Sequence, residues 1–167
     1  SQGTNPEHCS HAANLATSQN RAGLIATLVH EYGHILTLGV DEVTAHYDTC
    51  PTLVIDEGCV DTDSAIQSFI AEFWSQYGDD APGPENVDSE KGLAFYFDHE
   101  DDFVDTYAAT SPIEDIAESF MVWVVEDDPR GGSVVAAKLA FFEDYPVLVA
   151  ERDRIRAEFA QELGLSV

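Results

Sequence analysis

The most constraining feature of the sequence is an apolar helical pattern that contains two histidines and a glutamate. Aliphatic and aromatic side chains recur at three- and four-residue steps over residues 24–38, which predicts a largely buried helix that ends at Gly39. The pentapeptide HEYGH at residues 30–34 lies inside this pattern and matches H-E-x-x-H. Burying its polar groups is costly because each of them needs a partner. A metal ion shared by these side chains would be such a partner.

The spacing of this motif predicts a catalytic zinc site. Residues four apart project from one helix face, so His30 and His34 can bind one tetrahedral zinc while Glu31 points toward an open coordination position. Zinc lowers the pKa of a bound water to about 7, and Glu31 can take the proton as that water attacks a peptide carbonyl. We therefore expect an enzyme, a zinc metallopeptidase with Glu31 as the catalytic base. The alternative is a non-catalytic zincin-like binding module whose metal is structural or absent.

A catalytic zinc of this type needs a third protein ligand. The metzincin pattern is excluded because residues 35–43 contain no histidine. We expect Glu118 to be the ligand, since it lies in the most apolar part of a second predicted helix, where a carboxylate without a partner would be costly. Glu114 or Asp115 can then accept the free ring N–H of a ligating histidine. These two carboxylates and His46 remain the alternative ligands.

Several segments resemble the gluzincin family of zinc metallopeptidases. Residues 27–34 and 107–118 look like the branch that contains the lethal-factor peptidase domain and the proline-proline endopeptidases. Residues 57–74 are similar to a group of poorly characterised bacterial zinc metallopeptidases, and the likeness as a whole spans about residues 24–125. The resemblance implies that His30, His34 and Glu118 bind zinc, with Glu31 as the base.

The resemblance also implies a tyrosine that stabilises the oxyanion, about seven residues before the third ligand. Seven residues before Glu118 the chain has Ser111, so Tyr107, which lies eleven before, is the catalytic candidate. The alternative for Tyr107 is a packed core tyrosine, and His99 is a weaker substitute. Gluzincins also place a twisted sheet before the HExxH helix, and only 29 residues precede His30 here. We expect either a reduced sheet or a missing N-terminal portion.

The remaining periodicity predicts a mainly α, zincin-like domain of reduced α+β type, in which the third-ligand helix crosses the HExxH helix. We expect one domain over residues 1–167, with an irregular lead-in at 1–20 and a loop at 78–92. One further helix is expected from Thr62 or Asp63 to Gln76, and another is expected to begin near Pro112. Two more are expected at about residues 133–144 and 146–163. Short strands are expected around 53–55 and 93–97.

The charge of the chain limits its partners. Asp and Glu number 32 against 7 Lys and Arg, a formal net charge of −25, which argues against nucleic acid and anionic membrane surfaces. No apolar run approaches the roughly 20 residues of a membrane helix. The expected partner is a peptide or protein substrate, and the oligomeric state stays open. Such acidity fits a secreted or cell-surface protein, and we expect a bacterial one.

The cysteines and the acidic runs give two smaller predictions. Cys50 and Cys59 flank a segment that starts with proline and can turn back on itself, so we predict a disulfide between them and leave Cys9 over. The acidic residues at 56–63 and at 98–102 are candidates for a stabilising Ca²⁺ site. Neither run has the glycine and terminal glutamate of an EF-hand loop.

Overall fold

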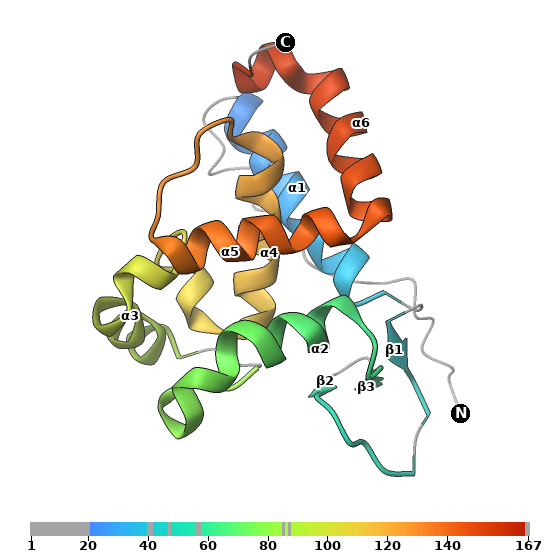
Figure 1. The fold of residues 1–167 in the computed structure, drawn as a ribbon, viewed down its shortest axis with the longest axis vertical. Helices are drawn as coiled ribbons and strands as arrows, with labels where there is room; N and C mark the ends of the chain where they lie inside the picture. The colour runs from blue at the N-terminus through green and yellow to red at the C-terminus, as the bar shows by residue number, and fades with distance from the viewer. Residues whose placement is uncertain are drawn as a thin grey trace.

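The structure is a computed structural model that describes residues 21–39, 42–46, 48–55, 58–84, 86 and 88–165. The chain is mainly helical with a small antiparallel sheet, as the sequence predicts (Figure 1). The predicted lead-in at residues 1–20, which includes Cys9, lies outside the described residues. The α-helices are α1 (Arg21–Thr37), α2 (Ala65–Phe69), α3 (Ser89–Asp98), α4 (Pro112–Val125), α5 (Ser133–Phe141) and α6 (Pro146–Leu163).

The helices α1 and α4 cross closely, and this is the most extensive contact between helices. A Cβ atom added at Gly33 would lie 3.2 Å from Cδ1 of Phe120 and 3.4 Å from Cα of Ala117. Glycine in mid-helix costs about 1 kcal/mol relative to alanine, and the close approach of the two helices explains why it is placed here. The predicted crossing of the HExxH helix by a second helix is confirmed.

The start of α4 is fixed by the residues that the sequence indicates. The Oγ atom of Ser111 accepts a hydrogen bond from the backbone N–H of Glu114 at 3.2 Å, and Pro112 occupies the first turn. The predicted helices over 133–144 and 146–163 are also present, as α5 followed by a short 3-10 turn (Phe142–Asp144) and as α6. The carboxylates at the N-terminal end of α4 therefore leave the helix from a well-defined first turn.

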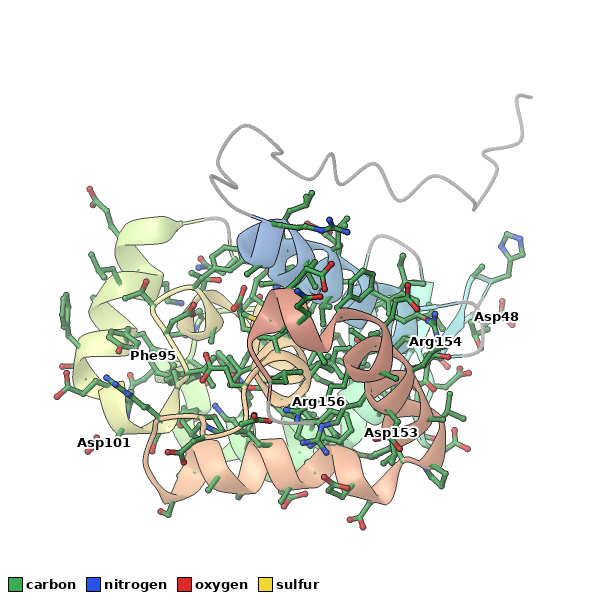
Figure 2. All side chains as sticks on the ribbon, turned by 90° about the horizontal axis from the view of Figure 1, so that it is seen from above. Asp48, Phe95, Asp101, Asp153, Arg154 and Arg156 are labelled. Carbon is green, nitrogen blue, oxygen red and sulfur yellow. A yellow bond between two sulfur atoms is a disulfide. The ribbon has the colours of Figure 1, made fainter. Side chains whose placement is uncertain are left out.

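The end of α4 is held by α6. Nε of Arg152 donates to the carbonyl of Trp123 at 3.0 Å, and Nε of Arg156 donates to the carbonyl of Val124 at 2.7 Å. Arg156 is labelled in Figure 2. These bonds satisfy carbonyl groups that the end of a helix leaves without partners. Because α1 also packs against α6, the two crossing helices share one support.

The sheet is small and is tied to the neighbouring loop by a disulfide. Strands β1 (Val43–Thr44), β3 (Gly58–Val60) and β2 (Val54–Ile55) pair in that order, and both pairings are antiparallel. The strand expected around 53–55 is confirmed. The predicted disulfide between Cys50 and Cys59 is present and joins β3 to the segment that precedes β2.

Two expectations about the middle of the chain are wrong. The loop predicted at 78–92 ends earlier, because the Asp88 side chain caps α3 by accepting hydrogen bonds from N of Glu90 (3.0 Å) and of Lys91 (3.2 Å). The strand expected around 93–97 is part of the same helix, whose Phe95 packs on Trp74. An apolar run this short fits a strand or a helix face equally well. The Asp88 cap favours the helix.

The second predicted helix starts later and changes geometry along its length. Ser64, rather than Thr62 or Asp63, caps α2, because its Oγ accepts a hydrogen bond from N of Gln67 at 3.1 Å. A π-helical turn (Ile70–Trp74) and a 3-10 segment (Ser75–Asp80) follow. None of the helices in the described part of the chain has the length and apolar character that crossing a bilayer requires.

Candidate metal centre

The crossing of α1 and α4 brings three potential ligand atoms to one point. Nε2 of His30 lies 3.1 Å from Nε2 of His34, and Oε2 of Glu114 lies 3.4 Å and 3.2 Å from these two nitrogens. Both histidines are buried, while Glu114 is half-buried. The i, i+4 spacing on α1 supplies the two rings, and the capped first turn of α4 supplies the carboxylate.

These separations match the distances between the ligands of one metal ion. Bonds of about 2.0–2.2 Å from nitrogen and oxygen to tetrahedral zinc put neighbouring ligand atoms about 3.3–3.5 Å apart. Oε2 of Glu114 is buried and makes no hydrogen bond of acceptable geometry to the described residues, although native proteins rarely leave such an atom unsatisfied. The cluster of His30, His34 and Glu114 can therefore hold a metal ion.

The positions of the two glutamates differ from the sequence assignment. Oε1 of Glu118 lies 2.8 Å from Nδ1 of His30, the ring nitrogen that faces away from His34. Glu118 is buried as expected, with an exposed fraction of 8%, but it lies at the other nitrogen of His30, and Glu114 is the carboxylate that joins the two histidines in the cluster that could hold a metal ion. Glu118 as the ligand stays a prediction, and the geometry adds Glu114 as the alternative. The apolar residues around Glu118 in the sequence predict that its side chain is buried. They do not predict which ring nitrogen of His30 the carboxylate faces.

Tyr107 lies beside this cluster. Its ring centroid is 5.8 Å from that of His30, and the side chain is 49% exposed. Burial raises the pKa of Tyr107, and the charge and hydrogen bond of Glu114 raise it further. Tyr107 also lies seven residues before Glu114.

The loop before α4 holds Tyr107 in place. Oδ1 of Asp105 accepts hydrogen bonds from N of Tyr107 at 2.9 Å and from N of Ala108 at 2.8 Å. A short 3-10 turn (Ala108–Thr110) then leads into α4. The tyrosine and the carboxylate of Glu114 are thus positioned by one continuous structured segment. Sequence reasoning missed Asp105, although an acid two residues before a turn is a recognisable signal for this role.

Without a metal, the cluster favours a protonated His30. Burial lowers the pKa of His30, but its close contacts with Glu114 and Glu118 and the charges of these carboxylates outweigh it and raise the pKa to about 9. Burial likewise raises the pKa of Glu114, but its close contacts with His30 and His34 and their charges bring it well below its usual range. The site therefore favours positive charge, and a cation can replace the proton.

Glu31 lies on a different face of α1 from the rings of His30 and His34. One residue of an α-helix turns by about 100°, so Glu31 is rotated away from His30. It is half-buried, and its charge is among the contributions that raise the pKa of Tyr107, after those of burial, Glu114 and Glu118. Glu31 and Tyr107 are therefore close enough to interact electrostatically.

Asp115 belongs to a separate buried cluster. Its Oδ2 lies 2.7 Å from Nζ of Lys138 and accepts a hydrogen bond from Nε1 of Trp74 at 2.8 Å. Its Oδ1 accepts from Oγ of Ser119 at 3.3 Å. Burial raises the pKa of Asp115 to about 6, although Lys138, Trp74 and Ser119 oppose the shift. Asp115 therefore supports neither histidine, and the sequence offered no signal for its pairing with Lys138.

The other histidines and acidic residues that the structure describes do not join the cluster. His46 is exposed, and His99 packs on Tyr77 and Phe95, with ring centroids 4.8 Å and 4.7 Å apart. Of the calcium candidates, Asp56 and Glu57 lie outside the described residues. Among the residues that are described, the cluster of His30, His34 and Glu114 is the only set of three such ligand atoms within 4.8 Å of one another.

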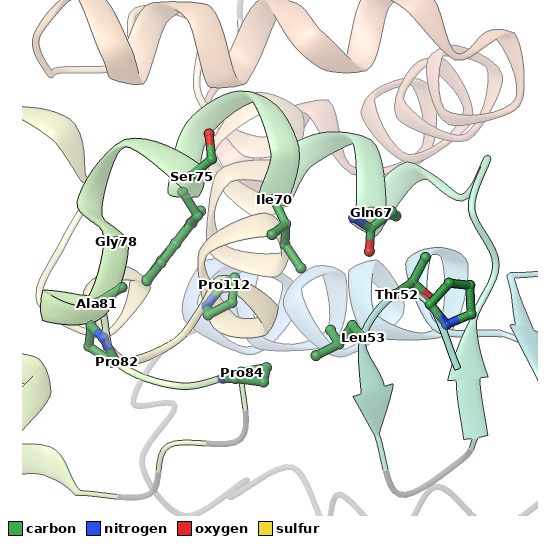
Figure 3. Close-up of a pocket in the computed structure, with 12 residues that line it drawn as sticks. Thr52, Leu53, Gln67, Ile70, Ser75, Gly78, Ala81, Pro82, Pro84 and Pro112 are labelled. Atoms are coloured by element: carbon green, nitrogen blue, oxygen red, sulfur yellow. The ribbon is translucent and has the colours of Figure 1, made fainter. Parts of the chain in front are cut away.

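A groove of about 440 Å³ opens on another side of the start of α4 (Figure 3). Leu53 and Ile70 point into it from the loop before β2 and from the π-helical turn. Its walls also contain four prolines, which are Pro51, Pro82, Pro84 and Pro112. Pro112 precedes Glu114 by two residues, but a step of two on a helix turns by about 200°. The groove and the metal centre therefore lie on different faces of α4.

Comparisons of this chain with protein-family models, with curated proteins and with solved structures found no match. The site itself brings two imidazole nitrogens and one carboxylate oxygen close together, and the half-exposed phenol of Tyr107 lies beside them. That donor set suits a divalent transition metal better than calcium or magnesium, which prefer oxygen ligands.

Proposed function

We propose that the chain is a zinc-dependent endopeptidase of the gluzincin type, with His30, His34 and Glu114 as metal ligands. The observation that carries the proposal is that the two histidines of an HExxH motif and Glu114 of α4 bring three potential ligand atoms within 3.1–3.4 Å of one another. Glu118 lies against Nδ1 of His30 and orients that ring, as outer carboxylates do in zinc sites.

The residues around the metal position have separate roles. Zinc, when bound, acts as a Lewis acid toward the substrate carbonyl and lowers the pKa of water to about 7. Glu31 takes the proton of the attacking water and later gives it to the leaving amine. The phenol of Tyr107 stays protonated at neutral pH, because its ordinary pKa of about 10 is raised further, and it donates a hydrogen bond to the developing oxyanion.

A catalytic site fits the residues better than a structural one. Structural zinc is normally closed by four protein ligands, whereas the described residues bring three ligand atoms together. Glu31 would have no purpose beside a closed site, and its half-buried place next to His30 suits a base. If the chain binds zinc but does not hydrolyse peptides, the alternative is a non-catalytic zincin-like binding module.

The substrate and location follow from the same proposal. The substrate is a peptide or an unfolded protein, since the net charge of −25 disfavours nucleic acid and anionic membranes. The disulfide between Cys50 and Cys59 is of the kind that persists in oxidising compartments. We therefore place the enzyme outside the cytoplasm, secreted or on a cell surface.

The test is hydrolysis of a quenched fluorescent casein by the zinc-loaded chain, beside Glu31→Gln. We expect cleavage that a chelator abolishes and zinc restores, and a loss of about 10²–10⁴-fold in Glu31→Gln. Both proteins should hold the same amount of zinc by elemental mass spectrometry. Equal activity in the two proteins would overturn the role of Glu31. Stoichiometric zinc without any hydrolysis would contradict the peptidase and favour the non-catalytic binding module.

A further inference from the structure

The groove beside the start of α4 is built from uncharged residues. Its volume is about 440 Å³, and none of the described residues that line it is an acid, a base or a histidine. The chain as a whole is rich in charge, with 32 acidic side chains and a formal net charge of −25. A volume of this size lies within the range of ligand-binding clefts in proteins. The groove is therefore an uncharged recess in an acidic protein, and it suits an apolar occupant.

Side chains from two walls face the space of the groove (Figure 3). Leu53 enters from the segment before β2, Ile70 from the π-helical turn and Gln67 from α2. The side-chain amide of Gln67 makes no hydrogen bond to the described residues. An amide has donors and an acceptor that can bond the backbone of a bound peptide. The groove thus offers apolar contacts together with one polar contact.

The walls of the groove are held in place before anything binds. Four of the lining residues are proline, whose ring fixes one backbone angle. The disulfide between Cys50 and Cys59 ties the segment that carries Pro51 and Leu53 to β3. A site that is already ordered loses less conformational entropy on binding. The groove is therefore prepared to bind a ligand without a large rearrangement.

The edge strand of the sheet continues from the wall that carries Leu53. Among the described strands, β2 lies at the edge in the order β1-β3-β2. The backbone N–H of Val60 donates to the carbonyl of Leu53 at 2.9 Å, and Val54 lies opposite Cys59. Bonded and non-bonded pairs alternate in an antiparallel ladder, so the N–H and C=O of Val54 point away from β3. An extended peptide can bond such an edge while its side chains enter a neighbouring pocket.

We propose that this groove binds an extended segment of another protein, with aliphatic side chains in the recess and lysine or arginine on both sides of them. Asp79 and Asp80 are exposed between the lining residues Gly78 and Ala81. Basic residues next to the aliphatic segment are therefore attracted, and acidic ones are repelled. A second copy of this chain is disfavoured as the occupant, because both copies carry a charge of −25.

This binding site is separate from the metal centre. The groove and the cluster of His30, His34 and Glu114 lie on different faces of α4, and they share no residue. The inference therefore goes beyond the proposed peptidase function and does not depend on it. Peptide binding in the groove and hydrolysis at the metal centre can be measured independently.

The test is the fluorescence anisotropy of a labelled peptide that has alternating leucines and valines between two pairs of arginines. The protein is the Glu31→Gln variant, so that hydrolysis does not consume the peptide. We expect saturable binding that weakens by at least about 10-fold when aspartates replace the arginines. A peptide with glycine and serine in place of the aliphatic residues should not bind, because it buries little apolar surface.

Variants of the groove locate the binding site. Leu53→Asn in the same background puts a polar amide into the recess and should weaken binding by at least about 10-fold. Leu93→Asn on α3, where Leu93 is 43% exposed, is the matched control and should bind as the parent protein does. Gln67→Ala removes only the polar contact and should weaken binding by about 2–10-fold. It keeps the test decisive if near-ultraviolet circular dichroism shows that Leu53→Asn does not fold.

Several results would overturn the proposal. They are no binding by the parent protein, equal binding of the peptides flanked by arginine and by aspartate, and equal affinity of Gln67→Ala and the parent. Equal losses in Leu53→Asn and Leu93→Asn would also overturn it, because binding would then not occur in the groove. A dimer in analytical ultracentrifugation that Leu53→Asn abolishes would assign the groove to a second copy instead. Failure of the wild type to hydrolyse casein would contradict the peptidase alone.

Discussion

Two buried polar clusters start from consecutive residues of α4 and differ in how their groups are satisfied. Asp115 pairs with Lys138 at 2.7 Å and accepts hydrogen bonds from Trp74 and Ser119. Glu114 faces two imidazoles, and its buried Oε2 makes no hydrogen bond of acceptable geometry to the described residues. The first cluster is complete within the protein, whereas the second has room for a cation.

The difference separates structural polar groups from functional ones. A complete buried network rigidifies the region that it joins, and the pair of Asp115 and Lys138 links α4 to α5. Nζ of Lys138 also donates to the carbonyl of Asp102 at 2.7 Å and lies 3.9 Å from the ring centroid of Phe103. The neighbouring incomplete cluster can then keep its ligand geometry without a metal, because the helix that carries Glu114 is already fixed.

The largest effect on stability is expected at the complete cluster. Lys138→Met leaves Asp115 as an uncompensated buried charge and should lower the free energy of unfolding by about 3–5 kcal/mol. Urea denaturation of the metal-free protein measures the change. The double variant Asp115→Leu with Lys138→Met is the control and should recover part of the loss, because no buried charge remains. A change below about 1 kcal/mol in Lys138→Met would contradict the structural role of the pair.

A smaller effect, confined to catalysis, is expected at Tyr107. Tyr107→Phe removes the phenol that donates to the oxyanion and should lower kcat by about 10²–10³-fold. Zinc content and melting temperature should stay near those of the wild type, because the ring is half exposed. Steady-state kinetics on a cleaved peptide, with Tyr96→Phe as the control, measures the effect. Unchanged kcat would make Tyr107 a packing residue.

At the supporting position the effect should be smaller again. Glu118→Gln weakens the contact with Nδ1 of His30 and should lower zinc affinity by about 10–100-fold without abolishing binding. Competition with a zinc chelator of known affinity measures the change. An affinity equal to that of the wild type would show that Glu118 does not tune the ligand. Complete loss of zinc from Glu118→Gln would indicate that Glu118 is itself a metal ligand.

The smallest effect concerns pH in the metal-free protein. The folded-state pKa of His30, about 9, lies above the ordinary value of 6.5, so protonated His30 adds stability below pH 6.5, and this is lost as pH rises through 9. We expect the metal-free protein to lose at least about 1 kcal/mol between pH 6.5 and pH 9.5. Denaturant melts at the two pH values measure the loss. The His30→Gln variant should lack it, and a loss of equal size in the variant would assign the effect to other groups.

Much of the scaffold was predictable because its signals are local. The period of α1, the Ser111 and Pro112 start of α4, and the disulfide between Cys50 and Cys59 each follow from residues close together in the sequence. The choice between Glu114 and Glu118 was not predictable. These carboxylates lie one turn apart, and only the crossing angle and rotation of α4 against α1 decide which of them reaches Nε2 of the histidines.

The buried pair of Asp115 and Lys138 was also beyond the sequence. Its members lie 23 residues apart on α4 and α5, and a lysine is usually exposed. Helix α3 was missed for a different reason. Its Asp88 cap lies in a stretch rich in proline, glycine and acidic residues, where loop signals outnumber the single capping signal.

The central claim is that His30, His34 and Glu114 form one zinc site. Its most direct test is the zinc content of purified wild type, His34→Ala, Glu114→Ala and Glu118→Ala by elemental mass spectrometry after dialysis against a weak chelator. We predict about one zinc per chain in the wild type, none in His34→Ala and Glu114→Ala, and partial retention in Glu118→Ala. Full zinc in Glu114→Ala together with none in Glu118→Ala would contradict the assignment, and no zinc in the reconstituted wild type would contradict the site.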